Sequence, residues 1–328
     1  MSLLPYSFVR PLLFAFDAET VHEHTIDVLA RTQHTMWRHA YAQPRIHDPV
    51  ALAGLTFPNR VGLAAGLDKN ARCIDAWEAM GFGFVEVGTV TPKGQPGNPK
   101  PRLFRLPQDE GVINRLGFNS EGHAPPHARL VARQGKPGLI GVNVGANKES
   151  ADRAGDYVQG VKAFADVASY FTINISSPNT PGLRALQTRA ALEELLGRLA
   201  ASRDALPASG RVPIFLKVAP DLEDGEVEAI VETVLAQGLA GIIVSNTTIT
   251  RPETLRSPLK GETGGLSGPP LMALSTTMLG RFHAANDRYR LTLIGAGGVA
   301  SGADALAGDR DAEGAKGSFK ARVFVDRK

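Results

Sequence analysis

The sequence predicts an α/β fold, a (β/α)8 TIM barrel preceded by two short helices, on three observations. From about Asp48 onward, short segments rich in β-branched residues alternate with helical segments, which is typical of a parallel sheet. The strand-like segments are apolar throughout, as expected of strands buried on both faces. Polar clusters follow nearly every one of them, at the ends that a barrel brings onto one face.

Length and composition fit one large barrel with a small appendage. The chain has 328 residues, 43% hydrophobic and 21% charged, which favours a packed core over disorder. A net charge of +3 is too small to indicate nucleic acid as a partner. The single cysteine, Cys73, excludes an internal disulfide, fits a reducing compartment and lies in a helical pattern as a small core residue. The sequence has neither an apolar run of about 18 residues nor a signal-peptide cleavage pattern.

Residues 1–45 differ in pattern from the rest of the chain. A dense apolar run extends from Leu3 to Phe16, and a second helix is expected over residues 18–39, with Asp17 as its cap. Two interpretations are open. The helices either plug one end of the barrel or form a monotopic anchor whose apolar face enters the lipid interface, with Arg10, Arg31 and Arg38 near the headgroups.

Seven strands are expected in the βα series, and an eighth would complete the barrel. A further strand over 52–55 precedes them, separated from the first of the seven by a turn at 56–59. Helical segments intervene, for example 190–202 and 226–237. The seven expected strands are 61–67, 84–87, 139–144, 171–175, 214–218, 241–245 and 291–294.

The stretch 172–182 is the most informative of the polar strand ends. It begins as a strand in which apolar and small polar residues alternate, and Pro178 and Pro181 then stop the ladder. Two amides and two hydroxyls therefore crowd one strand end: Asn174, Ser176, Ser177 and Asn179. Taken alone, the stretch fits a capped turn as well as a site, since these residues are ordinary turn formers.

The other strand ends favour a functional site over a simple capped turn. Polar groups follow the first, third, fifth and sixth strands, and two late glycine-rich turns, 264–268 and 295–298, are typical of the phosphate site of a barrel. Each signal is weak, but a barrel would bring all of them together. The residues concerned include Asp68, Lys69, Asn70, Asn143, Lys217, Asn246 and Thr247.

With these motifs in order, the chain resembles the quinone-dependent (class 2) dihydroorotate dehydrogenases of pyrimidine synthesis. The resemblance runs from about Tyr6 to Asp304 and includes AGLDKN at 65–70, INRLGFNS at 113–120, NISSPNTPGLR at 174–184 and KVAPDL at 217–222. It implies a barrel that binds FMN, oxidises (S)-dihydroorotate to orotate and passes the electrons to a membrane quinone. It also implies a peripheral protein on the cytoplasmic face of the inner membrane, with no metal.

The resemblance also implies roles for single residues. Ser177 would be the base that removes a proton from carbon 5 of dihydroorotate, and Thr180 and a water beside Phe118 would relay that proton, since serine alone is a poor base. Lys217 would stabilise the anionic reduced flavin, and His22 and Arg105 match positions at the quinone tunnel. The substrate would be held by Lys69, Asn114, Arg115, Leu116, Gly117, Phe118, Asn174, Asn179, Asn246 and Thr247. FMN would be lined by Ala65, Gly66, Thr89, Asn143, Asn174, Lys217, Ser245, Gly268 and Gly298.

The C-terminal part departs from the family pattern. After Leu306 the family continues with a helix, an eighth strand ending in Tyr-Ser or Tyr-Thr, and a closing helix. Here residues 307–320 are charged, glycine-rich and without periodicity, which indicates a loop or disorder and looks like a truncation or a changed reading frame. Only residues 322–326 could supply an eighth strand, so we expect an incomplete eighth unit. The expected divisions are a helical extension (1–45), the barrel (46–306) and an atypical tail (307–328).

Two alternatives to this function are open at this point. The atypical tail is consistent with a first alternative, in which the chain is an inactive or FMN-deficient remnant of the enzyme. A soluble class 1 enzyme that uses fumarate or NAD is disfavoured by Ser177, because that class has cysteine at this position, and by the apolar N-terminus.

Overall fold

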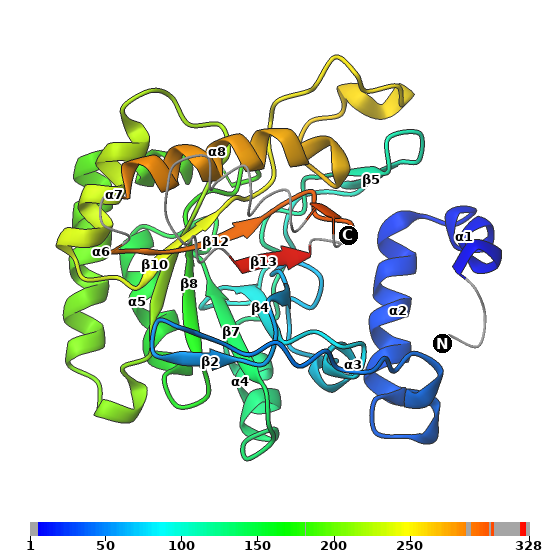
Figure 1. The fold of residues 1–328 in the computed structure, drawn as a ribbon, viewed down its shortest axis with the longest axis horizontal. Coiled ribbons are helices and arrows are strands. Elements are labelled where there is room, and N and C mark those ends of the chain that lie inside the picture. Colours follow the sequence, from blue (N-terminus) through cyan, green and yellow to red (C-terminus); the bar gives the residue numbers. More distant parts are fainter. Residues whose placement is uncertain (1–5, 181, 287–289, 302, 305–321, 326–328) are drawn as a thin grey trace.

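A closed barrel of eight parallel strands forms the centre of the molecule (Figure 1). The structure is a computed structural model and describes residues 6–180, 182–286, 290–301, 303–304 and 322–325. The expected barrel is confirmed. In spatial order its strands are β3 (Val61–Leu63), β4 (Phe84–Val90), β7 (Leu139–Val144), β8 (Tyr170–Asn174), β9 (Ile214–Val218), β10 (Gly241–Val244), β12 (Thr292–Ala296) and β13 (Arg322–Val325).

The eighth strand is present, although the sequence led us to expect an incomplete unit. β13 pairs in parallel with β12, where Ile294 lies opposite Arg322, and with β3, where Val61 lies opposite Val323. These residues belong to the segment that was the only candidate, and their pairing satisfies both edges that would otherwise stay open. The connection 305–321, and the expectation that no helix follows the strand, lie outside the described residues.

A hairpin plugs the amino-terminal end of the barrel. It consists of β1 (Val50–Leu52) and β2 (Leu55–Phe57) in antiparallel pairing. The strand expected over 52–55 is wrong, because the chain turns at Ala53 and Gly54, both at positive φ, as two-residue hairpin loops require. The turn expected at 56–59 lies at 58–60, between β2 and β3. Phe57 is thereby buried inside the barrel, and its ring lies 4.9 Å from that of Phe84.

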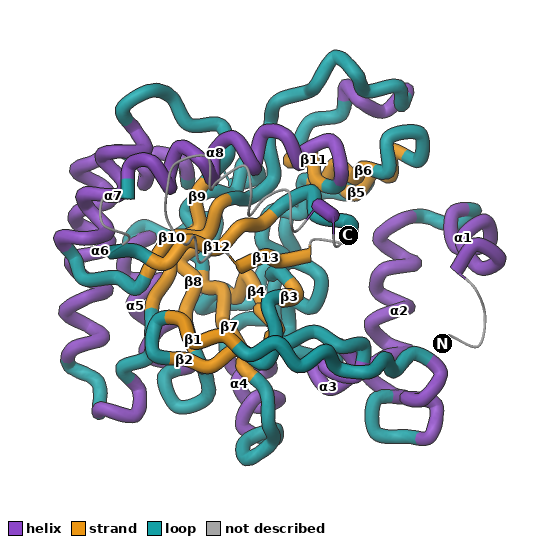
Figure 2. The backbone as a smooth tube through the Cα atoms, in the orientation of Figure 1, coloured by secondary structure: helices purple, strands orange, loops and turns teal. Residues whose placement is uncertain are grey.

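Helices cover the outside of the barrel, and the main hydrophobic core lies between them and the strands (Figure 2). Cys73 begins the first of them and is fully buried, as expected of a core residue, and burial raises the pKa of its thiol. The covering helices are α3 (Ile74–Ala79), α4 (Ala124–Val131), α5 (Arg153–Phe164), α6 (Arg189–Asp204), α7 (Glu226–Ala236) and α8 (Met272–Ala285). Short 3-10 turns occupy η2 (Arg184–Gln187), η3 (Ala208–Gly210), η4 (Pro258–Gly261) and η5 (Pro269–Leu271).

Two N-terminal helices, α1 (Tyr6–Phe14) and α2 (Ala18–Thr32), stand beside the barrel (Figure 1, blue). Asp17 caps α2 as expected, since its Oδ1 accepts a hydrogen bond of 2.9 Å from the backbone N–H of Thr20. The helix ends at Thr32 rather than at 39, and a separate 3-10 turn, η1 (Met36–Ala40), follows. Within the described part of the chain, no helix is long and apolar enough to cross a membrane.

A buried ion pair fastens α2 to the barrel. Glu19 and Arg102 are 4% and 7% exposed, and Arg102 Nη2 donates to Glu19 Oε1 at 2.8 Å. Burial alone would raise the pKa of Glu19, but the hydrogen bonds and charge of Arg102 outweigh it and hold that pKa below its ordinary value. No local sequence pattern predicts this contact, because the two residues lie far apart in the chain.

A three-stranded antiparallel sheet lies over the carboxyl-terminal end of the barrel. It is formed by β5 (Leu103–Leu106), β6 (Gly111–Asn114) and β11 (Gly265–Ser267), in the order β11–β6–β5. The sequence predicted only a long insertion here, since strand pairing between such distant segments leaves no local pattern. The sheet places Asn114 opposite both Leu103 and Gly265, above the strand ends.

Candidate active site

A small polar pocket of about 60 Å³ lies where the carboxyl ends of the strands meet the three-stranded sheet. Every residue that lines it, except Pro178, is one to which the resemblance assigned a catalytic, substrate-binding or cofactor-binding role. The lining consists of Ala65, Gly66, Lys69, Thr89, Asn114, Leu116, Gly117, Phe118, Asn174, Ser177, Pro178, Asn179, Lys217, Asn246 and Thr247. The barrel thus brings together six separate chain segments that no local pattern connects.

A continuous chain of hydrogen bonds runs beneath the pocket. Asn143 Nδ2 donates to Glu86 Oε1 at 2.8 Å, and Thr89 Oγ1 donates to Asn143 Oδ1 at 2.6 Å. Asn174 Nδ2 in turn donates to Thr89 Oγ1 at 3.0 Å, and Asn246 Nδ2 donates to Asn174 Oδ1 at 3.2 Å. The amides that line the pocket are therefore held in defined orientations before any ligand binds.

Ser177 lies in the loop after β8 and is 6% exposed. Its Oγ accepts a hydrogen bond of 3.3 Å from the backbone N–H of Asn179, whose side chain donates to the carbonyl oxygen of Asn114 at 3.1 Å. Neither a histidine nor a carboxylate is among the described residues that line the pocket. The hydroxyl groups among them belong to Thr89, Ser177 and Thr247.

Phe118 has a strained backbone at the pocket wall. Its φ is 54°, in the left-handed region that bulky side chains rarely adopt. The ring packs so closely on Gly145 that a Cβ there would lie 3.0 Å from Phe118 Cε2. The contact with Gly145 holds the ring of Phe118 in the wall of the pocket.

Lys217 is a buried cation at the floor of the pocket. It is 6% exposed and lies on β9, opposite Asn174 in the strand register. Within the described part of the chain it has no hydrogen bond or ion pair. An uncompensated buried ammonium is costly, so this position favours a ligand that brings electron-rich atoms. The pyrimidine edge of a flavin, which becomes anionic on reduction, meets that requirement.

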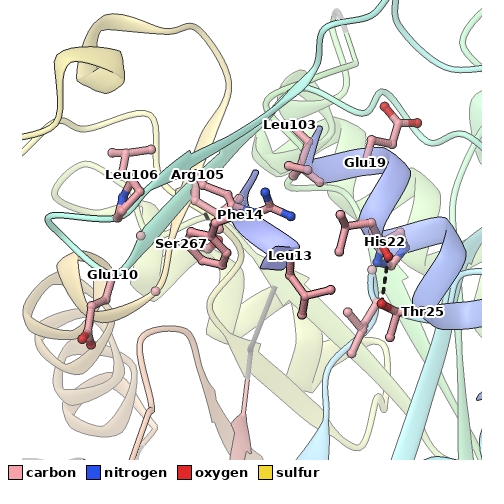
Figure 3. Close-up of a pocket in the computed structure, with 18 of the residues that line it drawn as sticks. Leu13, Phe14, Glu19, His22, Thr25, Leu103, Arg105, Leu106, Glu110 and Ser267 are labelled. Atoms are coloured by element: carbon pink, nitrogen blue, oxygen red, sulfur yellow. Dashed lines mark hydrogen bonds between the residues drawn. The ribbon is translucent and has the colours of Figure 1, made fainter. Parts of the chain in front are cut away.

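A larger cavity of about 660 Å³ adjoins the polar pocket and shares Gly66, Lys69 and Leu116 with it. It opens between the N-terminal helices and the barrel. In Figure 3, α2 contributes His22 to one wall and β5 contributes Arg105 to the other. Most of its remaining wall is apolar and includes Leu13, Phe14, Val21, Leu103, Leu106, Val112 and Val299.

Arg105 has a defined place in this wall. Its Nη1 donates to the carbonyl oxygen of Phe16 at 2.9 Å, and its guanidinium lies 4.6 Å from the centre of the Phe14 ring. The Arg10 guanidinium lies 4.5 Å from the centre of the same ring, so two arginines make cation–π contacts with Phe14. These contacts join α1 and the chain that follows it to β5.

Two glycine turns at the edge of the larger cavity can accept an anion. Gly268 and Gly298 both line it. Gly298 packs against the first residue of α8, since a Cβ added to Gly298 would lie 2.6 Å from the backbone N of Met272. Backbone N–H groups at a helix N-terminus favour a phosphate. Together with Lys217 and the amides, these turns fit a cofactor that carries a phosphate and an electron-rich ring. The turn after β13 lies outside the described residues.

Four of the expected site residues do not line either cavity. Asn143 and Ser245 are buried below the polar pocket, and Thr180 is buried within the Ser177 loop. The Arg115 guanidinium points away, stacking 4.4 Å from the Phe104 ring and donating to Glu262 Oε2 at 2.6 Å.

The sequence analysis missed several residues that support the site. Tyr157 donates from its hydroxyl to the carbonyl oxygen of Asn174 at 2.6 Å, and burial raises the pKa of that hydroxyl. Asn98 Nδ2 donates to the carbonyl oxygen of Asn179 at 3.2 Å. Glu86 was the one with a usable signal, because it is a lone acidic residue in an otherwise apolar strand.

The closed parallel barrel, with its polar pocket at the carboxyl ends of the strands, defines an α/β-barrel enzyme. The family profile of dihydroorotate dehydrogenases matches residues 49–310. The chain belongs to the dihydroorotate dehydrogenase family.

Individual relatives cover nearly the whole chain. It is 50% identical to a dihydroorotate dehydrogenase (quinone) of Delftia acidovorans, over 93% of this chain and 90% of the relative. It is 51% identical to the enzyme of the same name from Azorhizobium caulinodans, over 97% and 90%. Among solved structures, DHODH from Eimeria tenella in complex with ferulenol matches with a TM-score of 0.85 and 38% identity, over 95% of this chain and 86% of that chain.

Proposed function

We propose that this chain oxidises (S)-dihydroorotate to orotate in pyrimidine biosynthesis, with FMN as hydride acceptor and a membrane quinone as final electron acceptor. One observation supports this most strongly. Ser177, the buried Lys217, which has no partner among the described residues, and a chain of oriented asparagines share one pocket, and that pocket adjoins a second, mostly apolar cavity. Bound FMN supplies the two-electron chemistry that no side chain provides.

The residues of the pocket have separate roles in substrate binding and proton transfer in this proposal. The amides of Asn114, Asn174, Asn179 and Asn246 present both donors and acceptors, which suits a dihydropyrimidine ring that carries both. Lys69 suits the carboxylate of the substrate. Ser177 takes the proton from carbon 5, and its own proton leaves through the buried loop that contains Thr180.

The N-terminal extension provides the route for quinone in this proposal. The cavity between α2 and β5 is large enough for a small ligand and mostly apolar, and His22 and Arg105 supply polar groups in its wall. Large side chains on the outer side of this extension are exposed: Phe8 (78%), Leu12 (63%), Phe16 (59%), Met36 (80%) and Trp37 (64%).

These exposed apolar side chains support peripheral binding of the protein to the cytoplasmic face of the inner membrane. In this proposal residues 1–45 form the membrane-binding extension, residues 46–306 form the barrel and residues 307–328 form the tail.

The test is an electron-acceptor assay on purified protein supplied with FMN. We expect dihydroorotate to drive reduction of a short-chain quinone and to yield orotate in equal amount. Turnover with fumarate or NAD in place of quinone would support the soluble class 1 alternative. A lack of bound flavin and of orotate would support the inactive remnant.

A further inference from the structure

We propose that Glu86 is a positioning residue of this site, whose carboxylate sets the direction of the hydrogen-bond chain that orients the pocket amides. The proposal rests on the function proposed above. Glu86 does not line the pocket and would not touch substrate. It acts through Asn143, Thr89 and Asn174.

Glu86 is an unusual residue for the interior of a barrel. It lies in the middle of β4 and is 1% exposed. No lysine or arginine in the described part of the chain pairs with it, and its partners are all uncharged. Burying a carboxylate without a counter-charge is costly, whereas an apolar residue would pack here at no such cost. A buried charge at this position therefore points to a role other than packing.

The partners of Glu86 divide into two groups. Asn143 Nδ2 donates to Oε1 on the side of the pocket. Thr172 Oγ1 donates to Oε2 at 2.9 Å, and the Tyr170 hydroxyl donates to the same oxygen at 3.4 Å. Burial, together with the nearby Glu86 side chain, raises the pKa of Tyr170. Only the first contact leads to the site, so the two sides can be separated by mutation.

The acceptor at Oε1 fixes the direction of the first hydrogen bonds in the chain, those of Asn143 and Thr89. Because Asn143 must present Nδ2 to Glu86, it presents Oδ1 to Thr89, and the Thr89 hydroxyl has to donate. Thr89 Oγ1 can then only accept, which turns Nδ2 of Asn174 toward it and leaves Asn174 Oδ1 to accept from Asn246. Asn174 and Asn246 also accept from backbone N–H groups, of Ser176 (3.3 Å) and Thr247 (2.8 Å), whereas Asn143 depends on Glu86 for its orientation. Without the first acceptor, Asn143 could flip at little cost, since its two ends have nearly the same shape, and the Thr89 hydroxyl would no longer have a fixed direction toward Asn174.

The direction of the chain matters for ligand choice. A ring with fixed donors and acceptors binds well only to amides of matching orientation, and a mismatch leaves buried polar groups unpaired. Glu86 is thus expected to affect which pyrimidines bind, beyond how stable the protein is.

The experiment compares four proteins loaded with FMN: the parent, Glu86→Leu, Glu86→Gln and Thr172→Val. Thr172→Val is the matched control, because it removes a hydrogen bond from the same carboxylate on the side away from the pocket. For each protein, flavin content is measured, and the dissociation constants of orotate and a ring-N-methylated orotate are measured by calorimetry. The second ligand lacks one ring donor.

We expect Glu86→Leu to weaken orotate binding by about tenfold or more, the effect of one unpaired buried hydrogen bond, and to bring the two ligands closer in affinity. Glu86→Gln keeps an acceptor toward Asn143 and should restore the parental preference, and Thr172→Val should retain it. If Glu86→Leu does not fold, Thr89→Val breaks the chain one link further on and should cause the same loss of preference.

Each contrary result has a distinct meaning. Equal weakening of both ligands in Glu86→Leu, or in Thr89→Val where that variant replaces it, would show a purely structural role and overturn the proposal. Loss of preference in Glu86→Gln would also overturn it, since the acceptor is still present there. Failure of the FMN-loaded parent to bind orotate would instead overturn the proposed function.

Discussion

The ion pair between Glu19 and Arg102 makes the docking of α2 measurable. Glu19→Gln removes the charge that Arg102 faces while keeping the shape of the side chain. Removing one partner of a buried pair typically costs about 3–5 kcal/mol. Arg102 keeps its hydrogen bonds to the carbonyl oxygens of Pro96 (2.6 Å) and Asn98 (2.7 Å), so the lower end, about 3 kcal/mol, is expected.

A second acidic residue on the same helix provides the control. Glu23 lies 3.6 Å from Arg72, and its side chain is 51% exposed. An exposed pair of this kind contributes about 1 kcal/mol or less, so Glu23→Gln should change the urea midpoint of unfolding far less than Glu19→Gln. Equal midpoints for the two variants would refute the claim that the buried pair holds α2 in place.

The pH dependence of stability gives an independent check. The pKa of Glu19 is held below its ordinary value of 4.5, so the stability from this pair is fully present above that value and is lost as pH falls through the lower, folded-state pKa. Glu19→Gln should therefore remove part of the acid dependence of the urea midpoint. An unchanged acid profile would contradict the pairing.

Three further predictions concern the cofactor, the membrane and the tail. Lys217→Met should lower the reduction potential of bound flavin, because it removes the buried cation that favours the anionic reduced form; an unchanged potential in a flavin titration would contradict this. Deletion of residues 1–45 should abolish quinone reduction and flotation with anionic liposomes, and equal flotation of both proteins would exclude the anchor. Because the family's Tyr-Ser or Tyr-Thr turn is missing from the sequence, FMN should be lost on gel filtration, and near-stoichiometric flavin would show that turn to be dispensable.

Sequence patterns predicted what short-range periodicity encodes. Apolar runs rich in β-branched residues predicted the barrel strands from β4 to β12, and Asp17 predicted the start of α2. The end of α2 was placed too late, because the residues after Thr32 continue a helix-like pattern as a separate 3-10 turn. The hairpin at 50–57 was taken for part of a single strand at 52–55, because Ala53 and Gly54 are weaker turn signals than Pro58 and Asn59.

Long-range contacts explain what was missed. The pairing of β6 with β11 joins segments about 150 residues apart, so nothing near Asn114 predicts the sheet that carries it. The support from Glu86 and Asn98 also depends on distant partners. The pocket residues were found through the family motifs, whereas the hydrogen bonds that orient them became visible only in three dimensions.

The most direct test of the account is a single-turnover measurement on Ser177→Ala. Protein loaded with FMN is mixed anaerobically with dihydroorotate, and bleaching of the flavin is followed, while orotate affinity is measured separately. Because the asparagines bind and Ser177 supplies the base, the variant should reduce flavin about 10²–10⁴-fold more slowly and bind orotate within a few-fold of the parent. Flavin reduction at the parental rate in Ser177→Ala would contradict the central claim.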